Sequence, residues 1–390
     1  MGKDYAIGIA FEKRKISAAV LKNGEIIEFY SEEQFPLPAL LAAETLKDEL
    51  VIEIFRTYFS KIKEKAKEVL GIRVHEAVLT IPSKFHYEYY CNLLKKAAVE
   101  AGIEIKSVEI ETIMCMCGIA YMDRIANMED SEKYLVCYSD GICEEVAIME
   151  SGDGIIEQFG VLDDIKHENF FSRFLLENNK NNSISQILKN KGLEPQDIDK
   201  TYLIGETEED IDFLKKEVRK VFGNEEKIID GNFKKHILIG TACLAGKYAG
   251  VKEASDIVIL GVLNHSIGVE KSDGTVYRIL EKDTTIPVKT TIEISSLAQE
   301  MKRVHIVEGE NNMAQENYTI ADVNIADLIT ECAPIHLIVE IDMYNNITCQ
   351  VRNLDTDMIE AVTDEKDVAI KNVVLNALDM IEKATCSEEE

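Results

Sequence analysis

The sequence predicts an α/β part followed by an all-β part. Over roughly the first 250 residues, segments with strand periodicity alternate with segments with helical periodicity. The same opening pattern, short strands joined by tight turns, occurs near residue 5 and again near residue 134. Beyond residue 260 the chain contains many short strands, and their spacing is typical of a β-sandwich.

A β-meander opens the α/β part. We expect strands at Tyr5–Ala10, Ile16–Leu21 and Ile26–Tyr30. A long helix over Glu44–Leu70 follows, because apolar residues recur there at helical spacing and Gly71 is a suitable helix end. The next predicted elements are a strand at Ala77–Ile81, a helix from about His86 to Ala101 and a strand near Val108.

A second meander repeats this opening. Tyr134–Tyr138 and Glu145–Met149 are predicted strands, joined through a turn at residues 139–141. A further strand is expected at Thr201–Ile204. It precedes a helix that begins at Thr207, where Asp210 completes a capping box, and ends at Gly223.

The chain changes character after Gly250, where a polar stretch meets a bare apolar run. We place the boundary between the two parts there. Short strands are then expected at Ile267–Glu270, Val276–Leu280, Thr291–Ser295, Val304–Val307, Tyr318–Ile325, Ile335–Ile341 and Ile347–Val351. One amphipathic helix near residues 370–381 closes the chain before an acidic tail.

Charge limits the classes of partner. The chain has 43 Lys and Arg against 71 Asp and Glu, a formal net charge of −28. This excess would repel phosphate backbones and anionic lipid, so we expect neither direct nucleic-acid binding nor membrane binding. No apolar run approaches the roughly 20 residues of a membrane helix.

The cysteines and histidines predict no metal site and no nucleophile. The nine cysteines lack paired zinc or redox spacing, and the seven histidines are dispersed. Single core thiols are typical of a reducing compartment, so a cytoplasmic location is expected. Cys143 has no histidine near it in sequence, and we expect no catalytic residue there.

Eight collinear segments carry a resemblance to a known family. They are Ala6–Ile9, Glu76–Pro82 with Phe85, Ala97–Ile105, Asp197–Gly205, Gly240–Ala245, Ser266–Glu270, Thr284–Pro287 and Val304–Glu310. On these segments the chain resembles the DnaK-type heat-shock chaperones, the heat shock protein 70 family. No single segment would establish the likeness, but their common order does.

The resemblance implies an actin-like, two-lobed nucleotide-binding-type domain at residues 1–252. It also implies an interdomain linker at 253–260, with the apolar residues Ile257, Val258, Ile259 and Leu260, and a β-sandwich peptide-binding-type domain at 261–360. Residues 361–390 supply a helix and an acidic tail, so no full helical lid is expected. The short spacing between early elements implies that both outer subdomains are trimmed.

The family's first phosphate loop is altered. ATP binding needs small residues that let backbone N–H groups approach the phosphates, and carboxylates that hold Mg²⁺. Ala10 stands where the family has the metal-side aspartate, and Glu12 where it has a glycine. Trimming also removes the family's catalytic lysine, and Glu111 is a candidate for a glutamate of the family's connecting helix.

The other two loops depart as well. In the second loop, residues 138–142, Gly141 alone remains in place, and Cys143 replaces a threonine. In the adenosine loop, Glu206 replaces a glycine and Glu209 replaces an arginine. Carboxylates therefore face the place where polyphosphate would sit, and like charges about 4 Å apart cost on the order of 4 kcal/mol.

These departures predict a domain that does not hydrolyse ATP. Gly8, Gly141 and Gly205 are vestigial nucleotide-site residues in this interpretation, and ordinary turn glycines in the plainer one. Glu12, Glu206 and Glu209 are equally compatible with solvated surface charge. No cofactor is expected, and ATP with Mg²⁺ would bind only if the degenerate cleft still accepts it.

The resemblance also marks a peptide groove at Ser272, Ile294, Lys302 and Val304. Ser272 stands where the family has an apolar residue over the bound peptide. Lys302 or Arg303 replaces the aliphatic residue of the central pocket, while Ile294 stays apolar. Binding of generic apolar peptides is therefore doubtful.

The pattern is most similar to the atypical, lidless family member that pairs with a J-domain protein in the eukaryotic ribosome-associated complex. This implies a non-hydrolysing scaffold or co-chaperone whose partners are a J-domain co-chaperone and, indirectly, the ribosome, with a nascent polypeptide as a further candidate. Two alternatives remain: a divergent ATP-dependent chaperone with a weak ATPase, and a bacterial chaperone-like protein with an unrelated structural role.

Overall fold

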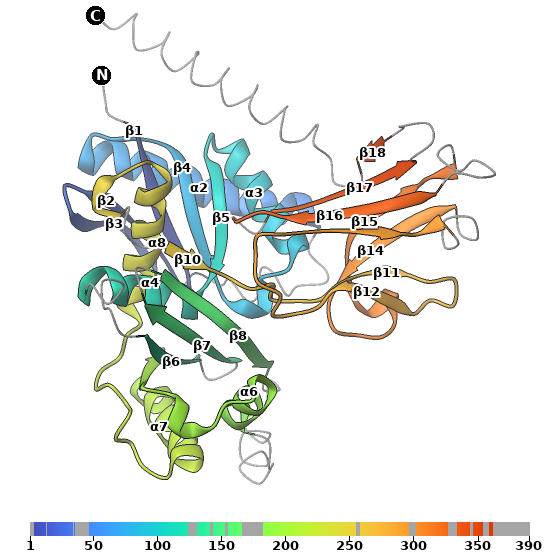
Figure 1. Cartoon of the computed structure of the whole chain (residues 1–390). Coiled ribbons are helices and arrows are strands. Elements are labelled where there is room, and N and C mark those ends of the chain that lie inside the picture. Colours follow the sequence, from blue (N-terminus) through green and yellow to red (C-terminus); the bar gives the residue numbers. More distant parts are fainter. Residues whose placement is uncertain are drawn as a thin grey trace, which may run out of the picture. The chain divides into compact units, whose positions relative to one another are not determined.

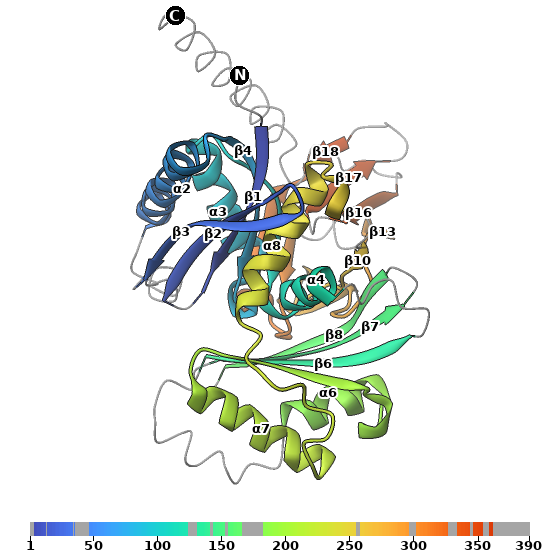
Figure 2. The same cartoon turned by 90° about the vertical axis from the view of Figure 1, so that its left-hand side faces the viewer.

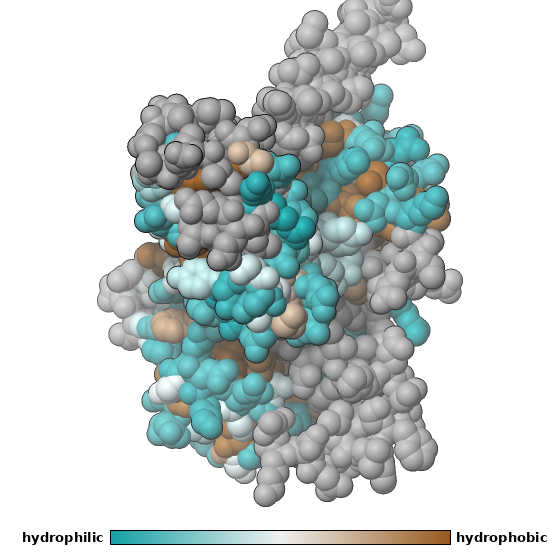
Figure 3. All heavy atoms as spheres, turned by 90° about the vertical axis from the view of Figure 1, so that its right-hand side faces the viewer, coloured by the Kyte–Doolittle hydropathy of each residue, from teal (hydrophilic) through white to brown (hydrophobic). Residues whose placement is uncertain are grey.

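The structure is a computed structural model of the whole chain (Figure 1). It describes residues 4–12, 14–33, 35, 47–123, 131–140, 143–152, 155–165, 182–254, 258–295, 302–326, 334–343, 346–353 and 359–361. Within these ranges, no helix has both the length and the apolar character needed to cross a membrane. On the face in Figure 3, hydrophilic side chains predominate over the described surface.

The chain divides into two compact units, each built from separate segments. Unit 1 comprises residues 1–46, 61–86 and 106–264. Unit 2 comprises residues 47–60, 87–105 and 265–390. The helix at 88–100 thus belongs with the C-terminal strands, and the predicted domain limits at 252 and 260 stay predictions.

The first sheet of unit 1 confirms the opening meander. Its five strands have the order β3-β2-β1-β4-β5. They are β1 (Asp4–Phe11), β2 (Lys15–Lys22), β3 (Glu25–Glu33), β4 (Arg73–Ile81) and β5 (Glu104–Ile110). β1 pairs antiparallel with β2 and parallel with β4, so a meander is followed by a parallel crossover.

The second sheet repeats this arrangement. Its order is β10-β8-β7-β6-β9. The strands are β6 (Glu132–Ser139), β7 (Cys143–Gly152), β8 (Ile155–Ile165), β9 (Lys200–Gly205) and β10 (Val258–Leu260). β6 pairs antiparallel with β7 and parallel with β9, as β1 does with β2 and β4. The repeat inferred from the sequence is therefore confirmed, although β8 was not predicted.

Two helices lie between the sheets (Figure 2). They are α4 (Glu111–Asp123), which begins at the residue assigned to the family's connecting helix, and α8 (Lys235–Tyr248), which the sequence analysis did not predict. Both are apolar on most sides, because each is buried between two layers. They cross closely: a Cβ atom at Gly240 would lie 1.9 Å from the Met114 carbonyl oxygen, and one at Gly118 would lie 2.1 Å from that of His236. Glycine is needed at this crossing because backbone meets backbone.

The far face of the second sheet is covered by α6 (Ser183–Lys191) and α7 (Glu208–Phe222) (Figure 2). The predicted capping box at the start of α7 is confirmed, since Thr207 Oγ1 accepts from the Asp210 N–H and Asp210 Oδ2 accepts from the Thr207 N–H. Gly223 ends the helix with φ 77°, as the helix-stop signal predicts.

Unit 2 contains two four-stranded sheets, ordered β12-β11-β14-β15 and β13-β16-β17-β18. The strands are β11 (Ile267–Glu270), β12 (Val276–Leu280), β13 (Val288–Glu293), β14 (Arg303–Glu308), β15 (Tyr318–Asn324), β16 (Ile335–Ile341), β17 (Ile347–Asn353) and β18 (Ile359–Ala361). The predicted strands are present within a few residues of their expected limits. Their packing as a β-sandwich stays a prediction, and the closing helix lies outside the described residues.

Unit 2 also contains α3 (Glu88–Glu100) and the first half of α2 (Asp48–Leu70). Single-turn helices are η1 (Ser83–Phe85), η3 (Pro195–Asp197), η4 (Lys252–Ala254) and η5 (Ala314–Glu316). The helices α2 and α3 match the two predicted between the first meander and β5.

Candidate functional site

The candidate site is a group of acidic side chains in unit 1, at strand ends of both sheets. Glu12 follows β1 of the first sheet and is 7 % exposed. Glu206 follows β9 of the second sheet, where its N–H donates to the carbonyl of Ser139, the last residue of β6. The sequence analysis placed these two glutamates at the family's first phosphate loop and its adenosine loop. We call the group formed by Glu12, Glu206, Lys234, Glu111, Asp140 and Glu145 the acidic cleft, after the nucleotide cleft that the family likeness predicts.

Lys234 joins the two glutamates. Its Nζ lies 2.6 Å from Glu12 Oε2 and 2.8 Å from Glu206 Oε2. Burial alone would lower the pKa of Lys234, but the two carboxylates outweigh it and raise that pKa, so the ammonium stays charged. Burial raises the pKa of Glu12, and Lys234 opposes that rise. One side chain thus supplies the cation for carboxylates carried by both sheets.

The segment before α8 fixes the position of Lys234. Asn232 Nδ2 donates to the Gly205 carbonyl at 2.8 Å, and Asn232 Oδ1 accepts from the Gly205 N–H at 3.3 Å. The same Oδ1 accepts from the Lys234 N–H at 3.1 Å. Because one amide side chain holds both backbones, the Lys234 ammonium is brought within reach of Glu206.

Two more glutamates lie at the start of α4. Glu145, on β7, accepts hydrogen bonds at Oε1 from the N–H of Thr112, at 3.2 Å, and from its hydroxyl, so it caps the helix. Glu111, the first residue of α4, is 1 % exposed, and neither of its carboxyl oxygens has a hydrogen-bond partner among the residues that the structure describes. Burial, followed by the charges of Glu145 and Asp140, raises the pKa of Glu111 well above its usual value. Burial and the neighbouring carboxylates therefore disfavour the ionised form of Glu111.

The described residues do not suit a metal-bridged polyphosphate. Among them, no group of three or more His, Cys, Asp or Glu side chains is arranged to hold a metal ion. The Ala10 side chain has no atom that could ligate a metal, and the Lys234 ammonium already pairs with the carboxylates of Glu12 and Glu206. A polyphosphate placed among these carboxylates would meet like charges in a partly desolvated site, which is strongly unfavourable.

The glycines marked by the sequence have local packing reasons. A Cβ atom at Gly8 would lie 2.4 Å from the Ala242 nitrogen on α8, and one at Gly205 would lie 2.8 Å from Ile211 Cγ1. Close packing therefore explains both glycines without any ligand, and their nucleotide role stays a prediction. Gly141 lies outside the described residues, as does the Cys143 side chain, and Glu209 is exposed on α7.

The predicted linker forms an edge strand. Val258, Ile259 and Leu260 make up β10, which pairs parallel with β8, whereas Ile257 lies outside the described residues. Val258 is paired in register with Ile155, and each is 38 % exposed. The edge of the second sheet thus presents two neighbouring apolar side chains to solvent.

The predicted peptide-groove residues fall into two groups in unit 2. Ser272 and Lys302 are exposed, and Lys302 has φ 54°. Ile294 is 3 % exposed and Val304 is fully buried. The second pair belongs to the apolar interior, and their role in binding a peptide stays a prediction.

The sequence analysis missed two residues of the acidic cleft, Lys234 and Glu145, and their partners Asn232 and Thr112. These four belong to no pattern in the chain, and Lys234 lies 28 positions from Glu206. The polar run before α8 was the one available signal, because residues that precede a buried helix often position its start.

A comparison of the chain with models of protein families gives a second line of evidence for the family likeness, besides the eight segments. The family model described as Hsp70 protein matches residues 162–384, more than half of the chain. The matched segment contains β9, α7, α8 and the strands of unit 2.

Proposed function

Because the chain belongs to the Hsp70 family, and so has a chaperone-like role in protein folding, we propose that it acts as a non-hydrolysing scaffold or co-chaperone. In this proposal it pairs with a J-domain protein and reaches the ribosome through that partner. The observation that carries the proposal is the Lys234 ion pair with Glu12 and Glu206.

This ion pair supports a scaffold function because a lysine of the chain itself, and no bound ligand, balances the charges of the acidic cleft. Lys234 neutralises carboxylates on both sheets, so the charges that would oppose each other are compensated by a side chain of the same chain. The raised pKa of Glu111 disfavours a further negative charge beside this ion pair. The two lobes therefore have a bond between them that needs neither nucleotide nor metal.

The apolar side chains on β10, the edge strand, and on its neighbour β8 support the proposal of a protein partner. Ile155 and Val258 lie side by side and are substantially exposed. Since the chain carries a net charge of −28, a basic partner would be favoured, and direct docking on RNA would not.

Co-purification from a native lysate tests the partnership. We expect recovery of a J-domain protein together with ribosomes, and loss of both on Val258→Asp, which puts a charge on the β10 edge. Tyr277→Asp, at a residue of β12 that is 54 % exposed, is the control and should retain them. Recovery of the wild type as a free monomer would count against the proposal.

A divergent chaperone with a weak ATPase is the second candidate. It is favoured by Asp140 and Glu111, two buried acids near the start of α4 that could still serve a hydrolytic site. Single-turnover hydrolysis by purified protein separates the two proposals. We expect no turnover above the uncatalysed rate, whereas a rate abolished by Glu111→Gln would favour the ATPase.

A further inference from the structure

Unit 2 contains a buried carboxyl, that of Glu308, which lies outside the acidic cleft. It lies where the start of α3 meets β14 and β15, and we call this contact the α3 joint, formed by Tyr87, Glu88, Tyr90, Glu308 and Tyr318. Helix α3 and these strands belong to the same compact unit.

Aromatic rings surround Tyr318 at the α3 joint. The ring centroids of Tyr87 and Tyr90 lie 4.2 Å and 5.4 Å from that of Tyr318. The hydroxyls of Tyr90 and Tyr318 are 3.1 Å apart, within hydrogen-bond distance. Tyr87 also stacks on His265, with centroids 3.8 Å apart. These ring contacts pack the joint, in which Tyr87, Tyr90 and Tyr318 are half-buried.

Glu308 enters this packed contact from the end of β14. It is 4 % exposed, and its Oε2 accepts from the Glu88 N–H at 2.6 Å, at the first residue of α3. A helix N-terminus favours a negative charge, but burial opposes it. The charged groups that act on Glu308 are Glu88 and Lys95 of α3 and Glu310 beyond β14.

Together, these effects favour the protonated, neutral form of Glu308. Burial is the largest effect and, with Glu88 and Glu310, it outweighs the helix N–H and Lys95, which raises the pKa of Glu308 to about 8. Lys95 gives limited help because its Nζ also donates to Asn346 Oδ1 at 3.0 Å.

We propose that the Glu308 carboxyl is a proton-operated latch: neutral, it holds α3 against β14 and β15, and ionised, it loosens that contact. When the joint opens, the carboxyl meets water and ionises like an ordinary glutamate. The closed joint therefore binds one proton more than the open joint between the two pKa values. This inference does not rest on the proposed function.

The difference in bound protons determines whether the closed joint gains or loses stability as pH rises. Because the folded pKa is raised, the contribution of Glu308 is fully present below the ordinary glutamate pKa. It is lost progressively as pH rises toward about 8, the pKa of the closed joint. Within that window the opening equilibrium should increase roughly tenfold for each pH unit.

Hydrogen exchange of the full chain, corrected for the intrinsic pH dependence of exchange, tests the latch. Peptides covering 88–100 and 303–308 should lose protection between about pH 5.5 and 8 with the slope given above. Glu308→Gln copies the neutral acid, and it should keep these peptides protected with no such slope.

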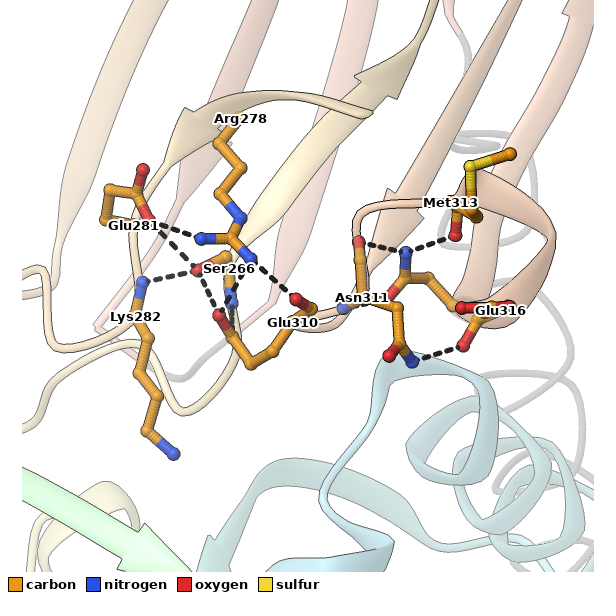
Figure 4. Close-up of polar contacts among 9 residues, drawn as sticks. Ser266, Arg278, Glu281, Lys282, Glu310, Asn311, Met313 and Glu316 are labelled. Carbon is orange, nitrogen blue, oxygen red and sulfur yellow. Dashed lines mark hydrogen bonds and ion pairs between the residues drawn. The ribbon is translucent and has the colours of Figure 1, made fainter. Parts of the chain in front are cut away.

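Glu310→Gln is the matched control. Glu310 accepts from the Ser266 N–H and hydroxyl, at 2.7 Å and 3.0 Å, and lies 3.6 Å from Arg278, so its main partners are elsewhere (Figure 4). The turn that follows it is held separately by the Asn311 and Asn317 amides. Because the Glu310 charge contributes to the raised pKa of Glu308, this variant should keep the wild-type slope while the upper end of the pH window moves to lower pH.

Two results would overturn the latch. One is a wild-type opening equilibrium that changes less than about twofold between pH 5.5 and 8, against the expected slope. The other is a slope that persists in Glu308→Gln. If that variant fails to fold, the carboxyl ¹³C titration of Glu308 in the wild type decides: a midpoint near the ordinary glutamate pKa contradicts the latch.

Discussion

The acidic cleft of unit 1 and the α3 joint of unit 2 both bury a glutamate, and they compensate the cost differently. Glu12 is 7 % exposed and is met by the Lys234 ammonium at 2.6 Å. Glu308 is 4 % exposed and is met by a helix N–H at 2.6 Å and by its own proton. An ion pair keeps its charges at neutral pH, whereas a neutral acid ties its contact to pH.

This difference separates a permanent feature from a variable one. The ion pair of the cleft joins residues from two sheets and depends on no diffusible ligand. The joint depends on proton concentration near neutrality, because the pKa of Glu308 is about 8. The cleft is thus the fixed part of the chain and the joint is the adjustable part.

The largest effect is expected from a substitution at the crossing of α4 and α8, the two helices between the sheets of unit 1. Gly240→Ala puts a Cβ atom 1.9 Å from the Met114 carbonyl oxygen, where backbone cannot move aside cheaply. Better helix propensity would return only about 1 kcal/mol, so we expect the free energy of unfolding to fall by about 3 kcal/mol or more. Urea denaturation measures the free energy of unfolding. A loss below about 1 kcal/mol would show that α4 and α8 can move apart more easily than their close approach suggests.

Breaking the ion pair comes next. Lys234→Met leaves Glu12 and Glu206 near each other without their cation, and we expect a loss of about 2–3 kcal/mol at pH 7. Lys235→Met, at the exposed neighbouring residue, should change stability by less than about 0.5 kcal/mol. Adding Glu12→Gln to Lys234→Met should recover part of the loss. Equal effects of the two lysine variants would remove the distinction between cleft and joint.

Glu111→Gln tests whether the cleft contains a pH-dependent group of its own. The pKa of Glu111 is raised, so the wild type loses its contribution as pH rises above the ordinary glutamate value. The variant, which copies the neutral acid, should match the wild type near pH 5 and exceed its stability near pH 8, by less than the Lys234 effect. Thermal unfolding at the two pH values measures this. A variant less stable at both would mean that Glu111 is ionised and paired.

The smallest effect is expected from removing one hydroxyl group at the α3 joint. Tyr318→Phe removes the hydroxyl 3.1 Å from that of Tyr90 and keeps the ring. We expect a loss of about 1 kcal/mol that is the same at pH 6 and pH 8, because the Glu308 carboxyl is untouched. Hydrogen exchange of 88–100 is the measurement, and a pH-dependent loss would mean that the hydroxyls share the proton of the latch.

Much of the fold was predictable because it rests on local signals. The two meanders, the capping box at Thr207 and Asp210, and the strands beyond residue 260 follow from turn residues and periodicity. Periodicity indicated neither α4 nor α8, because both are buried on most sides and lack the polar face that marks a helix in a sequence. The family likeness alone suggested a helix at Glu111.

The candidate site was predictable only in some of its acids. The likeness to a family placed Glu12 and Glu206, because those positions interrupt a recognisable loop. It could not place Lys234, since a contact over 28 or more positions leaves no periodic trace. Glu308 gave no signal either, because its partner is a backbone N–H 220 positions away.

The central claim is that a lysine of the chain already satisfies the acidic cleft. A calorimetric titration of the full chain with ATP and Mg²⁺ tests it most directly. The account predicts no measurable binding in the micromolar range, because Lys234 holds Glu12 and Glu206 and Ala10 offers no metal ligand. A clear submicromolar isotherm would contradict it.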